Sequence, residues 1–306
     1  MVATESTLDV SIVLPVHNEA GHLAEEIDRI SSSMEASHYS WELVLVDDGS
    51  TDGSAEIGLG LPNVRWLRSA RNRGAGTARR IGTEAARGRV VVWSDADMSY
   101  PNDKVPELVE KLGKGDHIVG ARTTEQGTLK ILRVPAKWVI RRLASYLTKT
   151  KIPDLNSGFR AFRRDVALQY THQLPAGFSC VTTITMAFLM NGYSVEFTPI
   201  DYAERAGSSK FHWLADTRRY ALQVIRMILS YDPLRVVLPI ASLIGVIFVA
   251  KLGYDLVDKD FRPAANTLLL GFALLQVLVI GLLADLVVRV TKPVRTVAPG
   301  DVTEVD

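Results

Sequence analysis

Residues 89–97 read RVVVWSDAD, an apolar run that ends in two aspartates. Residues 10–16 (VSIVLPV) and 41–48 (WELVLVDD) form two similar runs, and the second of these also ends in two aspartates. Short apolar runs rich in β-branched residues are typical of strands buried on both faces, so we predict strands over residues 10–16, 41–46 and 89–94. Because ligands bind at the carboxyl ends of the strands in a parallel sheet, we expect both acidic pairs to lie on one rim.

Helical patterns separate these runs. They predict helices over residues 19–34, 75–87 and 103–112, with further strands over 63–68 and 116–121. Such alternation is typical of an α/β domain, a mostly parallel sheet covered by helices.

The composition excludes several classes of protein. The chain has 306 residues, enough for one large α/β domain and an additional region. Its 47% hydrophobic and 23% charged residues exclude a disordered or collagen-like chain. The one cysteine, Cys180, excludes an internal disulfide framework and disfavours a cysteine-based zinc site. A net charge of +1 gives no global basic field, so we expect no nucleic-acid partner.

Two apolar runs near the C-terminus fit the high mean hydropathy of +0.11. Residues 236–254 and 268–288 each approach the roughly 20 residues that span a bilayer core. Basic residues flank the pair: Arg226, Arg235, Arg289, Lys292 and Arg295. The positive-inside rule therefore predicts a multi-pass membrane protein whose N-terminal region and tail are both cytoplasmic. The alternative is a pair of buried core helices.

Two basic segments accompany these runs. Residues 121–151 contain eight basic residues and one acidic residue, and residues 205–235 contain six and two. Within the first, residues 130–149 predict a helix with one apolar and one basic face, suited to a membrane interface. A core helix with a solvated basic face is the alternative. Residues 211–231 are a second amphipathic candidate, and together the two segments indicate phosphate at a membrane surface as partner.

Two short motifs each allow two interpretations. Asp95 and Asp97 could hold a hard cation such as Mg²⁺ or Mn²⁺, which would offset a diphosphate, or they could cap the turn that follows. Residues 73–79 (RGAGTAR) half-match a glycine-rich dinucleotide turn, but Arg79 stands at the third glycine. For this segment we favour a loop that opens a helix with an accessible N-terminus.

Taken in order, four segments resemble inverting glycosyltransferase family 2, which has a GT-A fold. They are residues 10–20 (VSIVLPVHNEA), 44–54 (VLVDDGSTDGS), 72–79 (NRGAGTAR) and 94–101 (SDADMSYP). Residues 152–162 (IPDLNSGFRAF), residues 204–211 (ERAGSSKF) and the two spans are similar to the polyprenyl-phosphate branch of that family. This branch comprises dolichol-phosphate-mannose-synthase-like enzymes and their bacterial glucosyl relatives.

The resemblance covers about residues 10–290 and implies a domain organisation. A loose leader (1–9) precedes a Rossmann-like GT-A catalytic domain (10–210) that includes the basic interface helix (130–149). A juxtamembrane helix (211–233), two transmembrane helices (234–290) and a cytoplasmic tail (291–306) follow.

The resemblance also implies which residues bind the nucleotide sugar. His17 stands where relatives usually have Tyr, and Ser99 where many have Gln. In relatives the loop matching residues 204–210 closes over the diphosphate. The implied donor set is Pro15, His17, Glu19, Val46, Asp47, Asp48, Asp95, Ala96, Asp97, Arg205, Ser209 and Lys210. The implied metal set is Asp97 as direct ligand of Mg²⁺ or Mn²⁺, with Asp95 and Ser99.

Relatives receive the lipid phosphate through an Arg and a Ser one turn later. The implied acceptor set is Arg122, Arg141, Arg142 as alternate, and Ser145. The residues expected to act in catalysis are Asp95, Asp97, Arg122 and Arg205.

The implied activity is inverting, metal-dependent transfer of a sugar to a polyprenyl monophosphate at the cytoplasmic membrane face. A phosphate monoester, with its second pKa near ~6, is already largely ionised and needs little help from a base. Asp154 is the nearest candidate for a base, and it fits a turn residue equally well. Two alternatives remain: a membrane-anchored family 2 transferase acting on a hydroxyl group, which would need a base, and a non-catalytic membrane scaffold. The sugar, the nucleotide and any homo-oligomer are left open.

Overall fold

The computed structural model describes residues 8–57, 59, 61–123, 142, 145, 148, 150–203, 229, 232–258 and 262–291. The chain divides into two compact units, Met1–Tyr220 and Ala221–Asp306, and each is described by itself.

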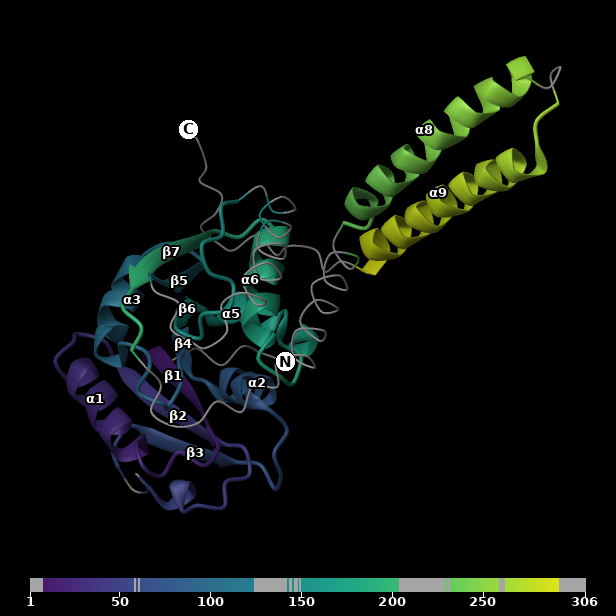
Figure 1. Ribbon diagram of the computed structural model, residues 1–306. Helices are drawn as coiled ribbons and strands as arrows, with labels where there is room; N and C mark the ends of the chain where they lie inside the picture. The colour runs from purple at the N-terminus through teal and green to yellow at the C-terminus, as the bar shows by residue number, and fades with distance from the viewer. Residues whose placement is uncertain are drawn as a thin grey trace, which may run out of the picture. The chain divides into compact units, whose positions relative to one another are not determined.

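A seven-stranded sheet forms the centre of the first unit, in the order β3-β2-β1-β4-β6-β5-β7 (Figure 1). All neighbouring strands pair in parallel except β6, which runs antiparallel to β4 and β5. The strands are β1 Leu8–Val16, β2 Trp41–Asp47, β3 Val64–Arg68, β4 Gly88–Trp93, β5 His117–Arg122, β6 Arg160–Arg163 and β7 Val195–Ile200. The predicted α/β class with a mostly parallel sheet is therefore confirmed.

Helices cover both faces of this sheet (Figure 1). They are α1 Leu23–Glu35, α2 Ala75–Ala85, α3 Val105–Leu112, α5 Arg164–Leu168 and α6 Cys180–Met190, with short 3₁₀ turns η1 Ser54–Glu56, η2 Asn102–Lys104 and η3 Thr171–Gln173. On one face, Ile12 and Leu14 of β1 pack with the apolar sides of α1 and α3. On the other, Val13 of β1 and Val46 of β2 lie against Gly82 of α2.

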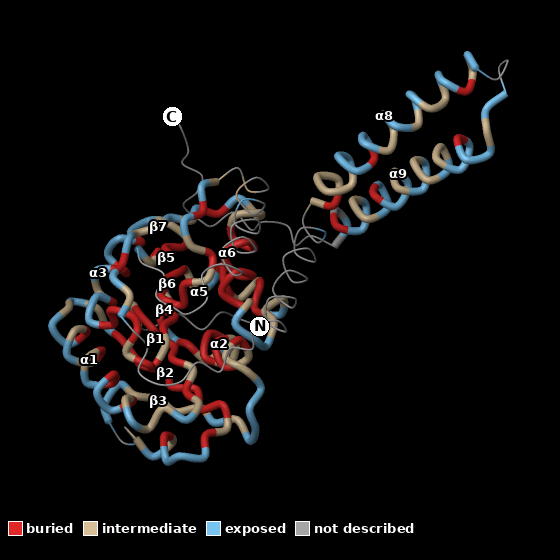
Figure 2. The backbone as a smooth tube through the Cα atoms, in the orientation of Figure 1, coloured by how far each residue is buried: buried red, intermediate tan, exposed pale blue. Residues whose placement is uncertain are grey.

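The buried residues run in continuous stretches along the central strands (Figure 2). All seven residues of β2 are buried, which explains why its sequence shows no alternation. The predicted strand over residues 41–46 and the observed one differ by a single residue. Strands β6 and β7 and helices α5 and α6 were not predicted.

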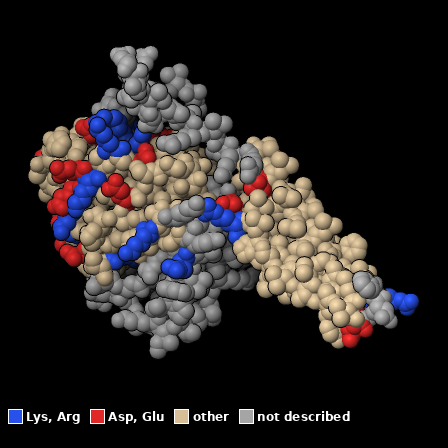
Figure 3. Space-filling model, turned by 90° about the horizontal axis from the view of Figure 1, so that it is seen from above, with Lys and Arg blue, Asp and Glu red and all other residues tan. Residues whose placement is uncertain are grey.

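Two long helices lie among the described residues of the second unit, α8 Leu234–Asp258 and α9 Ala265–Thr291. Both are long and apolar enough to cross a membrane, over Leu234–Asp258 and Ala265–Val288. Only 6% and 11% of their most apolar windows are buried, so they are not a pair of core helices. Charged side chains on the visible surface of this unit gather toward its ends (Figure 3). The predicted pair of C-terminal apolar spans is confirmed as two candidate membrane helices.

Several expectations fall on residues outside the described ranges. Of the basic interface helix, only Arg142, Ser145 and Thr148 are described, each in a helical conformation. The leader up to residue 7, the loop 204–210 and most of the juxtamembrane helix also lie outside, so these boundaries stay predictions.

Candidate active site

The carboxyl ends of three neighbouring parallel strands form the rim on which the acidic pairs lie. Val13 of β1 pairs with Val44 of β2 and with Trp93 of β4, so these three strands end at the same edge. His17 follows β1, the Asp47–Asp48 pair ends β2, and Asp95 and Asp97 follow β4. The rim expected from the sequence is therefore present.

The loops that follow β1 and β2 are linked by hydrogen bonds. The amides of Asn18 and Glu19 donate to Ser50 Oγ and Ser54 Oγ, each at 3.0 Å. In return, the Thr51 amide donates to Asn18 Oδ1 at 2.8 Å. Asn18 has a positive φ of 57°, a conformation that Asn tolerates better than most residues. The pair of loops is thus a preorganised platform, which contains the predicted donor residues His17 and Glu19.

Asp47 and Asp48 both hold backbone segments in place. Asp47 is fully buried, and its Oδ1 accepts a hydrogen bond from the Ser50 amide at 2.7 Å. The two carboxylate oxygens of Asp48 accept from the amides of Arg73 (2.8 Å) and Gly74 (2.7 Å). These contacts fix the loop before α2 against the end of β2. A donor contact of either aspartate stays a prediction.

The N-terminus of α2 is already occupied by protein, which corrects one expectation. The amides of Gly76 and Thr77 donate to the carbonyl oxygen of Ala176, at 2.7 and 3.3 Å. A Cβ added to Gly74 would lie 2.4 Å from that oxygen, and one added to Gly76 would lie 2.1 Å from the Pro175 oxygen. The glycines therefore admit a neighbouring chain segment, and the helix offers no accessible N-terminus to a phosphate.

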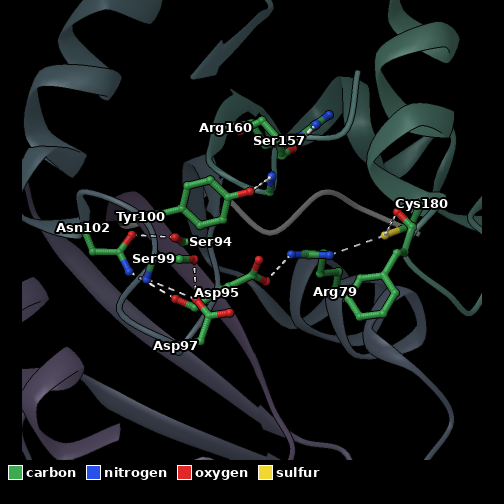
Figure 4. Close-up of polar contacts among 12 residues, drawn as sticks. Arg79, Ser94, Asp95, Asp97, Ser99, Tyr100, Asn102, Ser157, Arg160 and Cys180 are labelled. Carbon is green, nitrogen blue, oxygen red and sulfur yellow. Dashed lines mark hydrogen bonds and ion pairs between the residues drawn. The ribbon is translucent and has the colours of Figure 1, made fainter. Parts of the chain in front are cut away.

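The loop after β4 presents the two carboxylates with different partners (Figure 4). Asp95, whose side chain is 27% exposed, forms an ion pair with Arg79 of α2, with Oδ1 and Nη2 2.5 Å apart. Asp97, 5% exposed, accepts hydrogen bonds at Oδ1 from the amide and hydroxyl of Ser99. Asp97 thus caps the following turn, as one alternative expected. A carboxylate has about four lone-pair sites, so this capping does not exclude metal binding.

A buried polar group holds this loop from behind. Glu26 of α1 is fully buried and accepts hydrogen bonds from Asn102 Nδ2 at 2.7 Å and from the Met98 amide at 3.1 Å. Burial raises the pKa of Glu26 above its ordinary value. Sequence reasoning missed Glu26 and Asn102. The available signal was a glutamate next to Ile27, on the apolar side of an amphipathic helix.

Arg122, at the end of β5, faces Asp154. Its Nε lies 2.7 Å from Asp154 Oδ2 and its Nη2 lies 3.1 Å from Oδ1, a bidentate arrangement. Burial alone would raise the pKa of Asp154, but the hydrogen bonds and charge of Arg122 outweigh it and lower that pKa. The guanidinium also lies over the Tyr202 ring, 5.2 Å from its centroid. A carboxylate whose pKa is lowered and whose two oxygens are both bonded to Arg122 is a weak general base.

The remaining predicted residues are only partly described. Ser145 Oγ accepts a hydrogen bond from the Ile152 amide at 3.3 Å. Four predicted residues lie outside the described ranges: Arg141, Arg205, Ser209 and Lys210. Among the residues that the structure describes, no three His, Cys, Asp or Glu side chains gather into a metal cluster. The metal role of Asp95, Asp97 and Ser99 stays a prediction.

Curated relatives have names that refer to polyprenyl phosphates. An undecaprenyl-phosphate 4-deoxy-4-formamido-L-arabinose transferase of Shewanella sediminis (strain HAW-EB3) is 32% identical over 67% of this chain and 62% of its own length. The chain thus spans about three fifths of that relative. A protein of the same name from Enterobacter sp. (strain 638) is 28% identical over 96% of this chain and 93% of its own length. The dodecaprenyl-phosphate galacturonate synthase of Rhizobium johnstonii (strain DSM 114642 / LMG 32736 / 3841) is 29% identical over 53% of this chain and 50% of its own.

Solved structures and a family model identify the fold and the family. Glucosyl-3-phosphoglycerate synthase from Mycobacterium tuberculosis, in complex with Mn²⁺, UDP-glucose and phosphoglyceric acid, superposes with a TM-score of 0.53 at 19% identity, over 73% of this chain and 80% of that one. Mannosyl-3-phosphoglycerate synthase from Rubrobacter xylanophilus gives 0.51 at 19%, over 72% of each chain. Both share the GT-A fold with the first unit. The model of glycosyl transferase family 2 matches residues 11–171, more than half of the sequence, and the chain belongs to this family.

Proposed function

We propose that this chain transfers a sugar from a nucleotide-sugar donor to a polyprenyl monophosphate at the cytoplasmic face of a membrane, with inversion at the anomeric carbon. The alignment with the Enterobacter relative carries the proposal, because it covers 96% of this chain and so includes both α8 and α9 as well as the sheet. That relative is named for undecaprenyl phosphate and the Rhizobium protein for dodecaprenyl phosphate.

The donor would bind on the rim formed by β1, β2 and β4. Asp95 and Asp97 offer oxygen donors, which suit a hard cation, so the residues present fit Mg²⁺ or Mn²⁺. Asp97 would hold the metal directly, with Asp95 beside it and Ser99 orienting Asp97. A bound divalent ion would offset the charge of the donor diphosphate. The Mn²⁺ and UDP-glucose of the Mycobacterium tuberculosis complex, which has the same fold, are consistent with this role.

The acceptor phosphate would supply its own nucleophile. Its oxygen attacks the anomeric carbon while the nucleoside diphosphate leaves from the opposite side, which inverts the centre. No base is needed for an ionised phosphate. The pairing of Asp154 with Arg122 supports this mechanism over transfer to a hydroxyl, because the lowered pKa makes the nearest candidate base a weaker base and both of its oxygens are already bonded to Arg122. Catalysis then consists of positioning and charge compensation.

Helices α8 and α9 would hold the catalytic domain at the membrane surface, where a lipid-linked phosphate lies. Full-length protein should therefore sediment with membranes and need detergent for extraction. A variant lacking residues 233–306 should appear in the supernatant. Full-length protein in the high-speed supernatant without detergent would contradict the anchor.

The activity is tested by following the radiolabelled sugar of UDP-glucose, GDP-mannose and UDP-N-acetylhexosamines into an organic extract. Membranes containing the protein are incubated with added polyprenyl phosphate and Mg²⁺ or Mn²⁺. We expect label in the organic phase that depends on the added lipid, is lost with EDTA and is released by mild acid, as a glycosyl phosphate should be. Label in an acid-stable glycoside would instead favour a hydroxyl acceptor. Absence of transfer with these donors and with nucleotide donors of the sugars for which the relatives are named, 4-deoxy-4-formamido-L-arabinose and galacturonate, would favour a scaffold.

A further inference from the structure

Arg79, a buried cation on α2, ends the family-like segment 72–79 but was not among the predicted site residues. Its side chain is 1% exposed, and its Nη2 lies 2.5 Å from Asp95 Oδ1 (Figure 4). Its other amino group, Nη1, lies 3.7 Å from Cys180 Sγ, and the guanidinium lies over the Trp93 ring, 5.7 Å from its centroid. Burying a charge without an opposite charge costs several kcal/mol, so the Asp95 carboxylate is what makes this position tolerable for an arginine.

Gly158 bounds the same carboxylate from another side. A Cβ added to Gly158 would lie 2.9 Å from Asp95 Oδ2, 3.0 Å from Arg79 Nη2 and 3.2 Å from Tyr100 Cε2. The Gly158 amide donates to the Tyr100 hydroxyl at 2.7 Å, which fixes the backbone there. Asp95 is therefore confined between a guanidinium on α2 and a backbone segment that leaves no room for a side chain at Gly158.

We infer that Arg79 and Gly158 are positioning residues that hold Asp95 in the orientation needed to bind the donor diphosphate with its metal. The inference rests on the proposed function, which gives Asp95 its role. Arg79 is too deeply buried to touch a substrate, so it acts through Asp95. The ion pair fixes the carboxylate before the donor arrives, and a carboxylate that is already fixed loses less conformational freedom on binding.

The test measures nucleotide affinity, since that is where an effect through Asp95 should appear. Titration calorimetry in detergent, with UDP or GDP in the presence of Mn²⁺, compares wild type with Arg79→Met, Arg79→Lys and Gly158→Ala. We expect Arg79→Met and Gly158→Ala to bind the nucleotide at least about tenfold more weakly, equivalent to about 1.4 kcal/mol. Arg79→Lys should recover part of the loss, because it keeps the charge but not the planar fork. In kinetics, the KM for the nucleotide sugar should rise while the KM for the lipid stays the same.

Two controls separate positioning from a loss of stability. Arg65→Met breaks an ion pair of the same length, 2.5 Å between Arg65 Nη1 and Glu42 Oε2, near the starts of β3 and β2 and so away from the rim; Arg65 is 29% exposed. It should lower the melting temperature without changing nucleotide affinity. In an Asp95→Asn background, Arg79→Met should weaken nucleotide binding no further, because its effect passes through Asp95.

The outcomes distinguish this inference from the proposed function. Unchanged nucleotide affinity in folded Arg79→Met, or an undiminished effect of Arg79→Met in the Asp95→Asn background, would overturn the inference and leave the proposed function intact. If Arg79→Met does not fold, Gly158→Ala, which keeps every charge, decides in the same way. Wild-type protein that binds neither nucleotide with Mn²⁺ would instead contradict the proposed function, and the inference with it.

Discussion

The side-chain amide of Asn102 donates a hydrogen bond of 2.7 Å to the buried carboxylate of Glu26, which joins α1 to the loop that carries Asp95 and Asp97. The Met98 amide donates to the same carboxylate, and Met98 has a φ of +61°. A residue other than glycine in this region costs about 1–3 kcal/mol and persists where its surroundings hold it. Glu26 is one of the groups that hold it.

Glu26→Gln tests this arrangement. Glutamine has the same shape but only one side-chain oxygen, so one of the two donors will face an NH₂ group. Leaving a buried donor without an acceptor costs about 1–3 kcal/mol. We expect the free energy of unfolding to fall by about this amount, and the melting temperature to fall with it. Donor turnover should fall as well, since the loop carries Asp95 and Asp97. Wild-type stability in this variant would show that the Met98 conformation does not depend on Glu26.

The same variant has a predicted pH dependence. Burial raises the pKa of Glu26 above its ordinary 4.5, although Asn102 and Arg29 act in the opposite direction. Because the pKa of Glu26 is raised in the folded state, its titration adds to the free energy of unfolding. This contribution is complete below pH 4.5 and is lost as the pH rises through the pKa of the folded state. Glutamine does not titrate. The stability advantage of wild type over Glu26→Gln should therefore narrow as the pH rises, and an advantage that widens would contradict the prediction.

Gly76→Ala tests the role of the glycines before α2. Its new methyl would lie 2.1 Å from the Pro175 oxygen, so the segment around Ala176 must move away. Overpacking of this kind costs about 1–3 kcal/mol. Gly177→Ala is the matched control, because nothing lies within 4 Å of its added Cβ. We expect a lower melting temperature for Gly76→Ala than for Gly177→Ala. Equal melting temperatures would show that the segment around Ala176 does not pack closely against Gly76.

The strands that could be predicted are those whose own residues form a recognisable apolar run. β1, β2 and β4 are long apolar runs, and their predicted bounds are within about two residues of the observed ones. β6 has only four residues and is inserted antiparallel between β4 and β5, an arrangement that depends on distant partners. β7 contains Pro199 and is mostly half-exposed, and α6 is buried on nearly every side, so neither has a clear period.

The candidate site divides in the same way. Asp95 and Asp97 could be placed on the rim because they directly follow a strand. Arg79 could not be recognised, because whether an arginine is buried depends on the partner that folding brings to it. The N-terminus of α2 was expected to be accessible for the same reason: Ala176, which caps it, is far along the chain.

The Arg122–Asp154 pair leads to a prediction about acid stability. Arg122 lowers the pKa of Asp154 despite its burial, so the stabilisation is present above the ordinary value of 3.8 and is lost as the pH falls through the lowered pKa. Asp154→Asn should therefore cost stability at pH 7, about 3–5 kcal/mol for a mostly buried pair, and progressively less below pH 3.8. Thermal unfolding across pH measures this. A cost that does not depend on pH would mean that the carboxylate charge plays no part.

Asp97→Asn should lower metal-dependent turnover more than Ser99→Ala does. Asp97→Asn removes a charged oxygen ligand and should lower metal-dependent turnover by at least about a hundredfold, equivalent to about 2.7 kcal/mol. Ser99→Ala removes only the hydroxyl that donates to Asp97 Oδ1, and about tenfold is expected for the loss of one charge-assisted hydrogen bond. Calorimetric titration with Mn²⁺ and nucleotide should rank the variants in the same order. Undiminished turnover of Asp97→Asn with Mg²⁺ would remove Asp97 from the metal site.

The acceptor phosphate is predicted to bind Arg141, with Ser145 one turn later and Arg142 as the alternate. Losing a charge-assisted contact to phosphate costs about 1.5–3 kcal/mol. Arg141→Ala should therefore raise the KM for polyprenyl phosphate about tenfold or more. The KM for the nucleotide sugar should change little, because the donor residues lie on other loops.

Kinetics in detergent micelles, with both substrates varied, decide between the possible assignments. Lys151→Ala is the control, since it removes an exposed cation from the same basic segment without touching the predicted pair. If Arg142→Ala alone raises the lipid KM, the phosphate is held by the alternate arginine and the mechanism is unchanged. If the lipid KM stays constant while the donor KM rises, this helix serves the nucleotide sugar, because an arginine that contacts only the acceptor phosphate cannot weaken binding of the donor alone.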